Sequence, residues 1–229
     1  MADITTIAEI GTAVGTLFLG AATFGSTRSA NRAARVAERS LLLGMRPVLT
    51  PARDDDPDQK IMFGEGRKFL VPSGTGLVEE VDGVVYLAIP LRNVGTGLAV
   101  LQRYDISTGY QLQDVHGPLA PDLKRSSRKY GPLESFRAQQ IDIYIAPGDT
   151  GHWQAALRDP EDPLLAEVRQ MLATEPEPIA IDILYGDHGG GQHLISRFVL
   201  IPHSSGKWVC NVTFHWILDG DDPRELDED

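Results

Sequence analysis

The stretch at residues 207–217 (KWVCNVTFHWI) decides the fold, because bulky and polar residues alternate along it with a period of two. Every second position from Trp208 to Trp216 is large or apolar. Successive side chains of a strand point to opposite faces of a sheet, so this alternation predicts a strand with one buried face. We expect the single cysteine, Cys210, to lie on that buried face.

Other apolar runs, separated by turn residues, predict further strands. Residues 83–92 (GVVYLAIPLR) are almost continuously apolar, as is typical of a central strand. The remaining predicted strands lie at residues 139–145, 179–185 and 194–201, with a strand pair at 100–113. A helix is predicted at residues 162–173, where Pro163 falls in the first turn. This pattern favours a mainly β fold, an antiparallel β-sandwich of immunoglobulin-like architecture with one inserted short helix.

Composition narrows the class of protein. The chain has 229 residues, 42% of them hydrophobic and 23% charged, which is ordinary for a folded protein. Its net charge of -11 argues against nucleic-acid binding, which requires a dominant basic surface. One cysteine cannot form an internal disulfide, and this favours a reducing compartment.

The N-terminal segment differs from the rest of the chain. Residues 10–27 (IGTAVGTLFLGAATFGST) carry no charge, and as a helix they would span about 27 Å. That length is close to the thickness of a bilayer core, roughly 30 Å, so the segment predicts a single transmembrane helix. Gly11 and Gly15 form a GxxxG pair through which two such helices could self-associate, although small residues in a Gly-rich helix need no partner.

Three other interpretations of this segment stay open. A cleaved signal peptide should begin with basic residues, whereas this chain begins MADITTIAE. An interfacial amphipathic helix should carry a strong polar face, which residues 10–27 lack. A helix that packs against partner helices in water remains compatible with its Gly and Ala content.

A basic stretch follows at once. Arg28, Arg32, Arg35 and Arg39 are spaced so that a continuing helix would carry all four on one side, facing anionic headgroups. An exposed basic face that merely stops translocation would look the same. In either case the positive-inside rule places the arginines, and all that follows, on the cytoplasmic side of the cell membrane.

The sequence therefore divides into three parts. Residues 1–45 form the predicted transmembrane and basic juxtamembrane helix, which ends near Leu43 because Gly44 can cap it and Pro47 cannot continue it. Residues 46–218 form the β-sandwich domain, which begins with a solvated acidic loop around residues 54–58. Residues 219–229 carry seven acidic side chains against one arginine and predict a disordered tail.

Two motifs suggest a relationship. The Arg-rich stretch ends in Arg46-Pro47-Val48-Leu49, and the strand at 83–92 runs into the turn Asn93-Val94-Gly95-Thr96-Gly97 before Leu98-Ala99. With the single N-terminal membrane helix, these features resemble uncharacterised bacterial proteins in which an anchored immunoglobulin-like β-sandwich carries such a turn. The resemblance implies a fold and an anchor, and it implies no activity.

The loop from Gly186 to His193 is the main candidate for chemistry. Asp187, His188 and His193 flank three consecutive glycines, and imidazole and carboxylate ligands together could bind a divalent metal. The alternative is an exposed hairpin tip. A metal site here would make the chain a metal-assisted hydrolase or a ligand-binding enzyme.

Two further motifs have simpler interpretations. The turn at residues 93–97 looks like a phosphate-binding glycine loop, but it is followed by a predicted strand, and such loops require a helix there. The basic cluster Lys124, Arg125, Arg128 and Lys129 lies in a long predicted loop and could contact lipid headgroups or a partner, or simply be solvated.

The sequence contains no GxSxG, HExxH or P-loop motif. It predicts no cofactor and favours a non-enzymatic protein. The expected function is a membrane-anchored protein-binding or scaffold module at the cytoplasmic membrane face, with the bilayer and an unidentified membrane or cytoplasmic protein as partners.

Overall fold

The computed structural model describes residues 20, 23–24, 26–37, 40–41, 44–110 and 130–219. It divides the chain into two compact units, Met1–Gly44 and Met45–Asp229. In the first unit, residues 26–37 are helical and every described residue is exposed. Of the described residues that follow, 40, 41 and Gly44 are helical and Met45 forms a turn, close to the predicted end of the helix.

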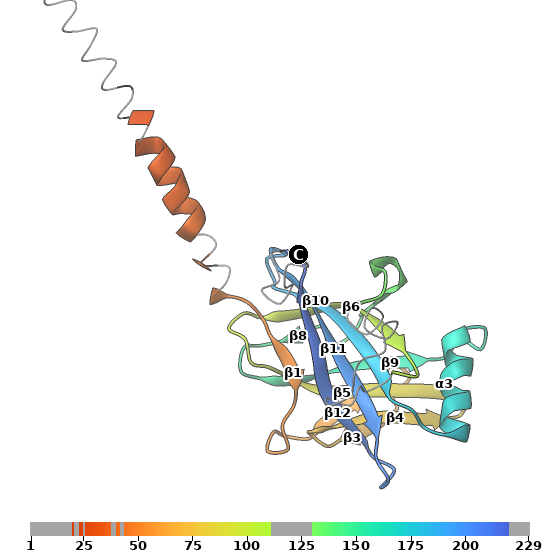
Figure 1. The fold of residues 1–229 in the computed structure, drawn as a ribbon. Helices are drawn as coiled ribbons and strands as arrows, with labels where there is room; N and C mark the ends of the chain where they lie inside the picture. The colour runs from red at the N-terminus through yellow and green to blue at the C-terminus, as the bar shows by residue number, and fades with distance from the viewer. Residues whose placement is uncertain are drawn as a thin grey trace, which may run out of the picture. The chain divides into compact units, whose positions relative to one another are not determined.

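The second unit, called the β unit below, is mainly β and antiparallel (Figure 1). Ten strands form one curled sheet in the order β1-β5-β4-β12-β11-β10-β6-β7, with β9 added to β5 and β8 added to β6. Strands β2 and β3 form a separate two-stranded sheet. The elements are β1 (Leu49–Pro51), β2 (Gln59–Met62), β3 (Lys68–Val71), β4 (Thr75–Val81), β5 (Val84–Asn93), β6 (Ala99–Ser107), the 3-10 helix η1 (Leu133–Ser135), β7 (Arg137–Ala138), β8 (Tyr144–Ile145), β9 (Thr150–Leu157), α3 (Pro163–Thr174), β10 (Ile179–Gly186), β11 (His193–Pro202) and β12 (Trp208–Ile217).

Strand β5 is the centre of one half of the sheet, as its apolar sequence predicts. It pairs with β9 along one edge and with β4 and then β1 along the other. Both of its faces are buried: Leu87 and Ile89 point into the main core, while Tyr86 and Ala88 lie under the β2–β3 hairpin. A strand covered on both sides has no need to alternate apolar and polar residues.

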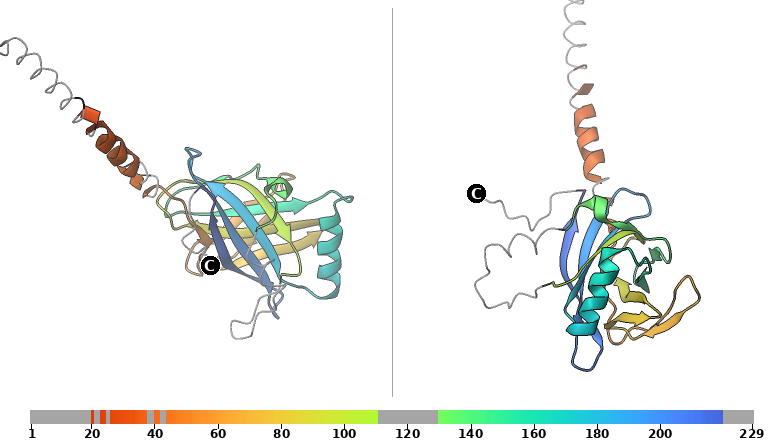
Figure 2. Two further views of the ribbon diagram at one scale, coloured as in Figure 1. Left: turned by 45° about the horizontal axis from the view of Figure 1, so that its top comes forward. Right: turned by 90° about the vertical axis from the view of Figure 1, so that its right-hand side faces the viewer.

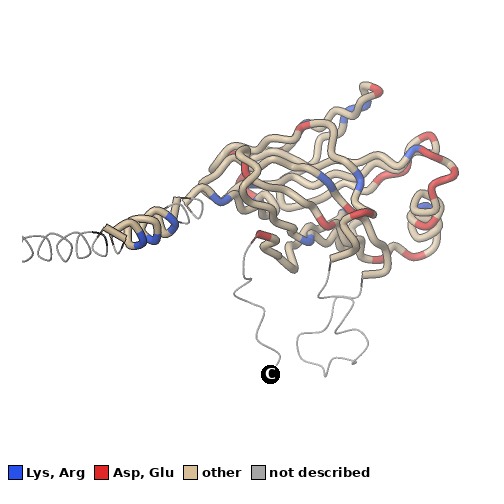
Figure 3. The backbone as a smooth tube through the Cα atoms, turned by 90° about the horizontal axis from the view of Figure 1, so that it is seen from above, with Lys and Arg blue, Asp and Glu red and all other residues tan. Residues whose placement is uncertain are grey.

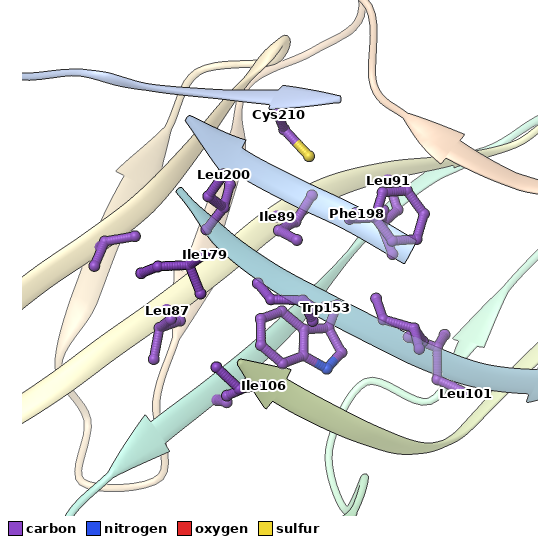
Figure 4. Packing of buried hydrophobic residues seen from close by; sticks show 14 of the residues in the cluster. Leu87, Ile89, Leu91, Leu101, Ile106, Trp153, Ile179, Phe198, Leu200 and Cys210 are labelled. Atoms are coloured by element: carbon purple, nitrogen blue, oxygen red, sulfur yellow. The ribbon is translucent and has the colours of Figure 1, made fainter. Parts of the chain in front are cut away.

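Strand β4 lets the sheet curl. Its first residues, Thr75 and Gly76, pair with β12, whereas the residues from Leu77 onward pair with β5. The two halves of the sheet thus enclose one core, in which Trp153 from β9 packs among residues of β5, β6, β10 and β11 (Figure 4). The observed architecture is a curled antiparallel sheet, and the immunoglobulin-like sandwich stays a prediction.

Helix α3 packs its apolar side against the same core, as the sequence predicts (Figure 2). Leu165, Val168 and Met171 are its buried residues. The Asp162 side chain caps the helix by accepting a hydrogen bond from the Leu164 amide at 3.0 Å. It also accepts two hydrogen bonds from Arg137, at 2.6 and 3.1 Å, and so ties the helix to β7.

Replacing Asp162 with alanine should lower the free energy of unfolding at pH 7 by about 1–2 kcal/mol, because the cap and the ion pair are lost together. The hydrogen bonds from Arg137 hold the pKa of the Asp162 carboxyl below its ordinary value. A lowered pKa stabilises the fold above the unfolded value of about 3.9, and this stability is lost as the pH falls through the folded pKa.

Denaturant unfolding at pH 7 and pH 3 measures this effect, and Glu161→Ala is the control because Glu161 is an exposed neighbour. The difference between wild type and Asp162→Ala should shrink at pH 3. A difference of the same size at both pH values would contradict the assigned ion pair.

One prediction about β12 is wrong. Trp208 and Cys210 are buried as expected, but Trp216 packs on the opposite, outer face of the sheet, and Phe214 stacks on its ring. The register to β11 shifts by one residue between Arg197 and Phe198, which makes Thr213 the extra residue of a β-bulge. A bulge exchanges the two faces of a strand, so an unbroken alternation in sequence does not keep one face throughout.

Two other expectations require correction. Residues 139–145 form no continuous strand: only Tyr144 and Ile145 pair with β6, and Asp142 adopts a positive φ of 51°. The acidic loop at 54–58 is also not simply solvated, because Asp56 pairs with Arg92 and Asp58 accepts a hydrogen bond from the Ser73 amide at 3.2 Å.

Candidate functional site

An extensive network of buried polar side chains surrounds the first residues of the β unit, 45–49. At the end of β5, the side chain of Asn93 is completely buried and makes four hydrogen bonds to backbone groups. Its Oδ1 accepts from the amides of Val48 (3.2 Å) and Gly95 (3.0 Å). Its Nδ2 donates to the carbonyls of Gly97 (2.7 Å) and Ile145 (3.0 Å). One side chain thus joins the entering chain, the following turn and β8.

The two glycines of the turn allow the entering chain to lie against it. A Cβ atom on Gly95 would lie under 3.0 Å from backbone atoms of residues 46–48, and a Cβ on Gly97 would overlap the Met45 carbonyl group. The turn also holds the entering chain through its backbone, since Thr96 donates to the Arg46 carbonyl at 3.1 Å and Val94 to the Val48 carbonyl at 2.8 Å. Glycine is needed here for close approach of two backbone segments.

The Gly-rich loop from Gly186 to His193 holds the entering chain from another direction. Nε of Arg46 donates to Oε1 of Gln192 at 3.0 Å, and Gln192 is buried. The buried Asp187 carboxylate fixes this loop by accepting from the amides of Gly191 (2.8 Å) and Gln192 (3.3 Å). Together, the turn at 93–97, Gln192 and the hydroxyl of Tyr185 form what we call the seat of residues 45–49.

Tyr185 completes the seat from inside the core. Its hydroxyl accepts a hydrogen bond from the Leu49 amide at 3.2 Å and lies 3.0 Å from Oγ of Ser196. Nδ1 of His215 lies 2.9 Å from the same Ser196 oxygen. Burial raises the pKa of the Tyr185 hydroxyl, which therefore stays protonated at neutral pH. This network was not predicted, although polar residues at inward-facing positions of apolar strands are a signal of one.

The contact between Ser196 and His215 has the composition of a nucleophile and its base, but Ser196 is 0% exposed. A nucleophile must reach a substrate, so this pair satisfies buried polar groups and does not form a catalytic site.

The predicted metal ligands do not converge. Asp187 lies inside its loop, whereas His193 pairs with Asp219, with Nδ1 2.9 Å from the carboxylate oxygen. His188 is exposed. Among the residues that the structure describes, no group of three or more His, Cys, Asp or Glu side chains is placed to hold a metal ion. The geometry of the loop thus gives the metal-assisted alternative no support.

A second carboxylate–imidazole pair joins Asp142 to β9. Nε2 of His152 lies 3.2 Å from the Asp142 carboxylate, and Nε2 of Gln154 donates to the same oxygen at 3.2 Å. Burial lowers the pKa of His152 while Asp142 opposes that shift. This pair was not predicted, because the apolar alternation of residues 139–145 is typical of a strand.

Part of the basic stretch can be placed. Arg28, Arg32 and Arg35 are exposed along the helical segment 26–37. Figure 3 shows the basic positions of this segment in blue. Arg39, Gly11, Gly15 and the cluster Lys124, Arg125, Arg128 and Lys129 lie outside the described residues. Within the helical residues that are described, no segment is long and apolar enough to span a membrane. Most of the predicted span, residues 10–27, is not among them.

In comparisons with known proteins, no protein family, no curated protein and no solved structure matches the chain.

Proposed function

We propose that this chain is a membrane-anchored, non-enzymatic protein whose β unit, an immunoglobulin-like sandwich, serves as a protein-binding or scaffold module at the cytoplasmic membrane face. The seat is the observation that carries this proposal. The seat holds the chain from Met45 onward, six residues after Arg39. A β unit that needed free movement would be joined by a longer Gly- and Ser-rich linker.

Sequence supports the anchor. An uncharged segment of bilayer length is followed at once by basic residues spaced to lie on one helical face. The described residues of the first unit are exposed, including the apolar side chains of Phe24, Val36 and Leu41. Apolar side chains without a core are expected where a bilayer or a partner helix surrounds a helix.

The arrangement of the β unit supports a binding role over catalysis. Its buried polar groups, in the seat and around Tyr185, are engaged in holding backbone segments together. A scaffold needs a rigid body, and the seat fixes the first residues of the β unit to the rest of that unit. The arginines that directly follow the uncharged segment favour the cytoplasmic side for the β unit by the positive-inside rule.

Charges placed inside the predicted span test the anchor in the full chain. Leu17→Arg together with Leu19→Asp puts two charges near the centre of residues 10–27, where each costs about 2.5–3.5 kcal/mol of insertion free energy. The wild-type chain should stay with the membrane after an alkaline wash, and the charged variant should be released.

Leu17→Ile with Leu19→Ile is the control, because it keeps the segment apolar, and it should behave as wild type. A reporter fused to the C-terminus that is active only in the cytoplasm then tests orientation. A wild-type chain that is soluble without detergent would overturn the proposal.

A further inference from the structure

The β2–β3 hairpin has one buried face and one exposed face. Its inner residues Ile61, Phe63, Phe69 and Val71 pack on β5, and the rings of Phe63 and Tyr86 lie 4.8 Å apart in an edge-to-face contact. In the right-hand view of Figure 2, the hairpin, coloured orange to yellow, lies at the margin of the β unit. Because the inner face is fixed in this way, the outer face is a rigid surface.

The outer face combines two apolar and two basic side chains. The strand register sets Lys60 opposite Leu70 and Met62 opposite Lys68, so the two kinds of residue alternate across the hairpin. Met62 is 56% exposed and Leu70 is 60% exposed. Met62 and Leu70 thus give the rigid outer face a small apolar area between two lysines.

The charge of this face is not compensated locally. Nearby basic residues have acidic partners, since Arg67 pairs with Asp82 and Arg158 with Glu65. In the described part of the chain, Lys60 and Lys68 form no ion pair. This stands out in a chain with a net charge of -11. The face is thus complementary to an anionic surface.

We infer that the outer face of the β2–β3 hairpin contacts the anionic surface of the bilayer in which the chain is anchored; this inference rests on the proposed function. Lysines attract anionic headgroups and extend their ammonium groups past apolar neighbours, while Met62 and Leu70 enter the interfacial layer. Four side chains are too few for a protein interface, which buries about 1,200 Å² or more. They suffice for a lipid contact, because the anchor already holds the β unit at the membrane.

The test uses the full chain in vesicles of phosphatidylcholine, with or without about 30% phosphatidylserine. Leu70→Cys carries a polarity-sensitive dye, and brominated lipids measure its contact with the bilayer. Val212→Cys, at a side chain 40% exposed on β12 and away from both the hairpin and the seat, is the matched control. The native Cys210 is buried and burial raises the pKa of its thiol, so the dye reacts at the introduced cysteine.

The dye at position 70 should be quenched about twofold more in anionic than in neutral vesicles. Lys60→Gln together with Lys68→Gln should lower the equilibrium constant for contact between the hairpin and the anionic bilayer by more than about tenfold. Equal quenching at positions 70 and 212, or quenching unaffected by the lysine changes, would overturn the inference. The inference would also be overturned if the two lysine changes abolished binding of an acidic protein to the chain but left the lipid contact unchanged.

Flotation of the vesicles in the same experiment reports on the anchor. A chain that floats with the vesicles but shows no quenching at position 70 loses only the hairpin contact. A chain that does not float at all contradicts the anchor and the hairpin contact together.

Discussion

Replacing Asn93 with alanine is expected to lower the free energy of unfolding of the β unit by about 3 kcal/mol or more. The change removes four buried hydrogen bonds and leaves two amides and two carbonyl oxygens without their partner. Each unsatisfied buried group costs about 1–3 kcal/mol, and water cannot reach Asn93 without opening the seat.

Urea unfolding followed by tryptophan fluorescence measures this loss. Asn211→Ala is the control: Asn211 is an exposed residue of β12, and its replacement should change stability by less than about 0.5 kcal/mol. Hydrogen exchange of the Val48 and Leu49 amides, which donate to Asn93 and Tyr185, gives a local measurement. Their protection should fall in the Asn93 variant.

Gly97→Ala provides an independent route to the same state, because it leaves Asn93 in place and crowds the Met45 carbonyl. Gly64→Ala is its partner control, since a Cβ there would meet nothing within 4 Å. If Gly97→Ala and Gly64→Ala unfold alike, or if the Val48 and Leu49 amides keep their protection, the seat does not hold the entering chain.

Removing either partner of the Asp182–Arg197 pair is expected to cost about 3–5 kcal/mol, whereas removing both together should cost far less. The pair lies across β10 and β11 on the outer face of the sheet, with Nε and Nη2 of Arg197 donating to the carboxylate at 2.6 and 2.7 Å. The guanidinium also lies over the rings of Tyr110 and Trp216. Both side chains are buried, so a lone survivor would be an uncompensated charge.

A double-mutant cycle with Asp182→Leu and Arg197→Met measures the coupling between them. The same treatment of Arg67 and Asp82 is the matched control, because that pair has a similar 2.6 Å separation but an exposed Asp82. An exposed pair should give a coupling below about 1 kcal/mol. A coupling for Asp182 and Arg197 no larger than this would contradict the buried pair.

The pH dependence of Arg197→Met adds a second measurement. Asp105 lies opposite Asp182 on β6, and burial, followed by repulsion from Asp182, raises its pKa. A raised folded pKa stabilises the fold below the unfolded value of about 3.9, and that stability is lost as the pH rises through the folded pKa. Without Arg197, the carboxylates of Asp105 and Asp182 repel each other with no cation between them. The loss of unfolding free energy relative to wild type should therefore be largest at neutral pH and smallest near pH 4.

The strands that sequence predicts well are those with a continuous apolar run. Residues 83–92, 179–185 and 194–201 each match an observed strand to within a residue or two, as does the helix at 162–173. In β5 and β10 both faces are buried, so apolar content alone marks them. The mainly β class followed from these elements.

Strands with a weak apolar pattern, which join the sheet only through pairing with residues distant in sequence, were not predicted. β9 contains Gly151, His152 and Gln154, and β4 contains Glu79 and Glu80, so neither has a strong apolar pattern. Each belongs to the sheet because of its pairing with β5. The bulge at Thr213 is similarly absent from the local sequence, since it exists only relative to β11.

Only part of the seat could be predicted from the sequence. The glycines at 95 and 97 and those at 189–191 resemble, in sequence, the glycine loops of sites that bind external ligands. Their partner is the chain itself, at a distance of 146 residues between Arg46 and Gln192. No local spacing rule predicts that contact.

That separation has a consequence for the order of events during synthesis. Residues 45–49 leave the ribosome early, but their hydrogen-bond partners at Asn93, Tyr185 and Gln192 follow up to 146 residues later. At about 5–20 residues per second, translation leaves the entering segment without its partners for roughly 7–30 s. Formation of the hydrogen bonds to residues 45–49 is therefore a late folding step. The N-terminal segment is exposed to its surroundings before the β unit can hold the entering chain.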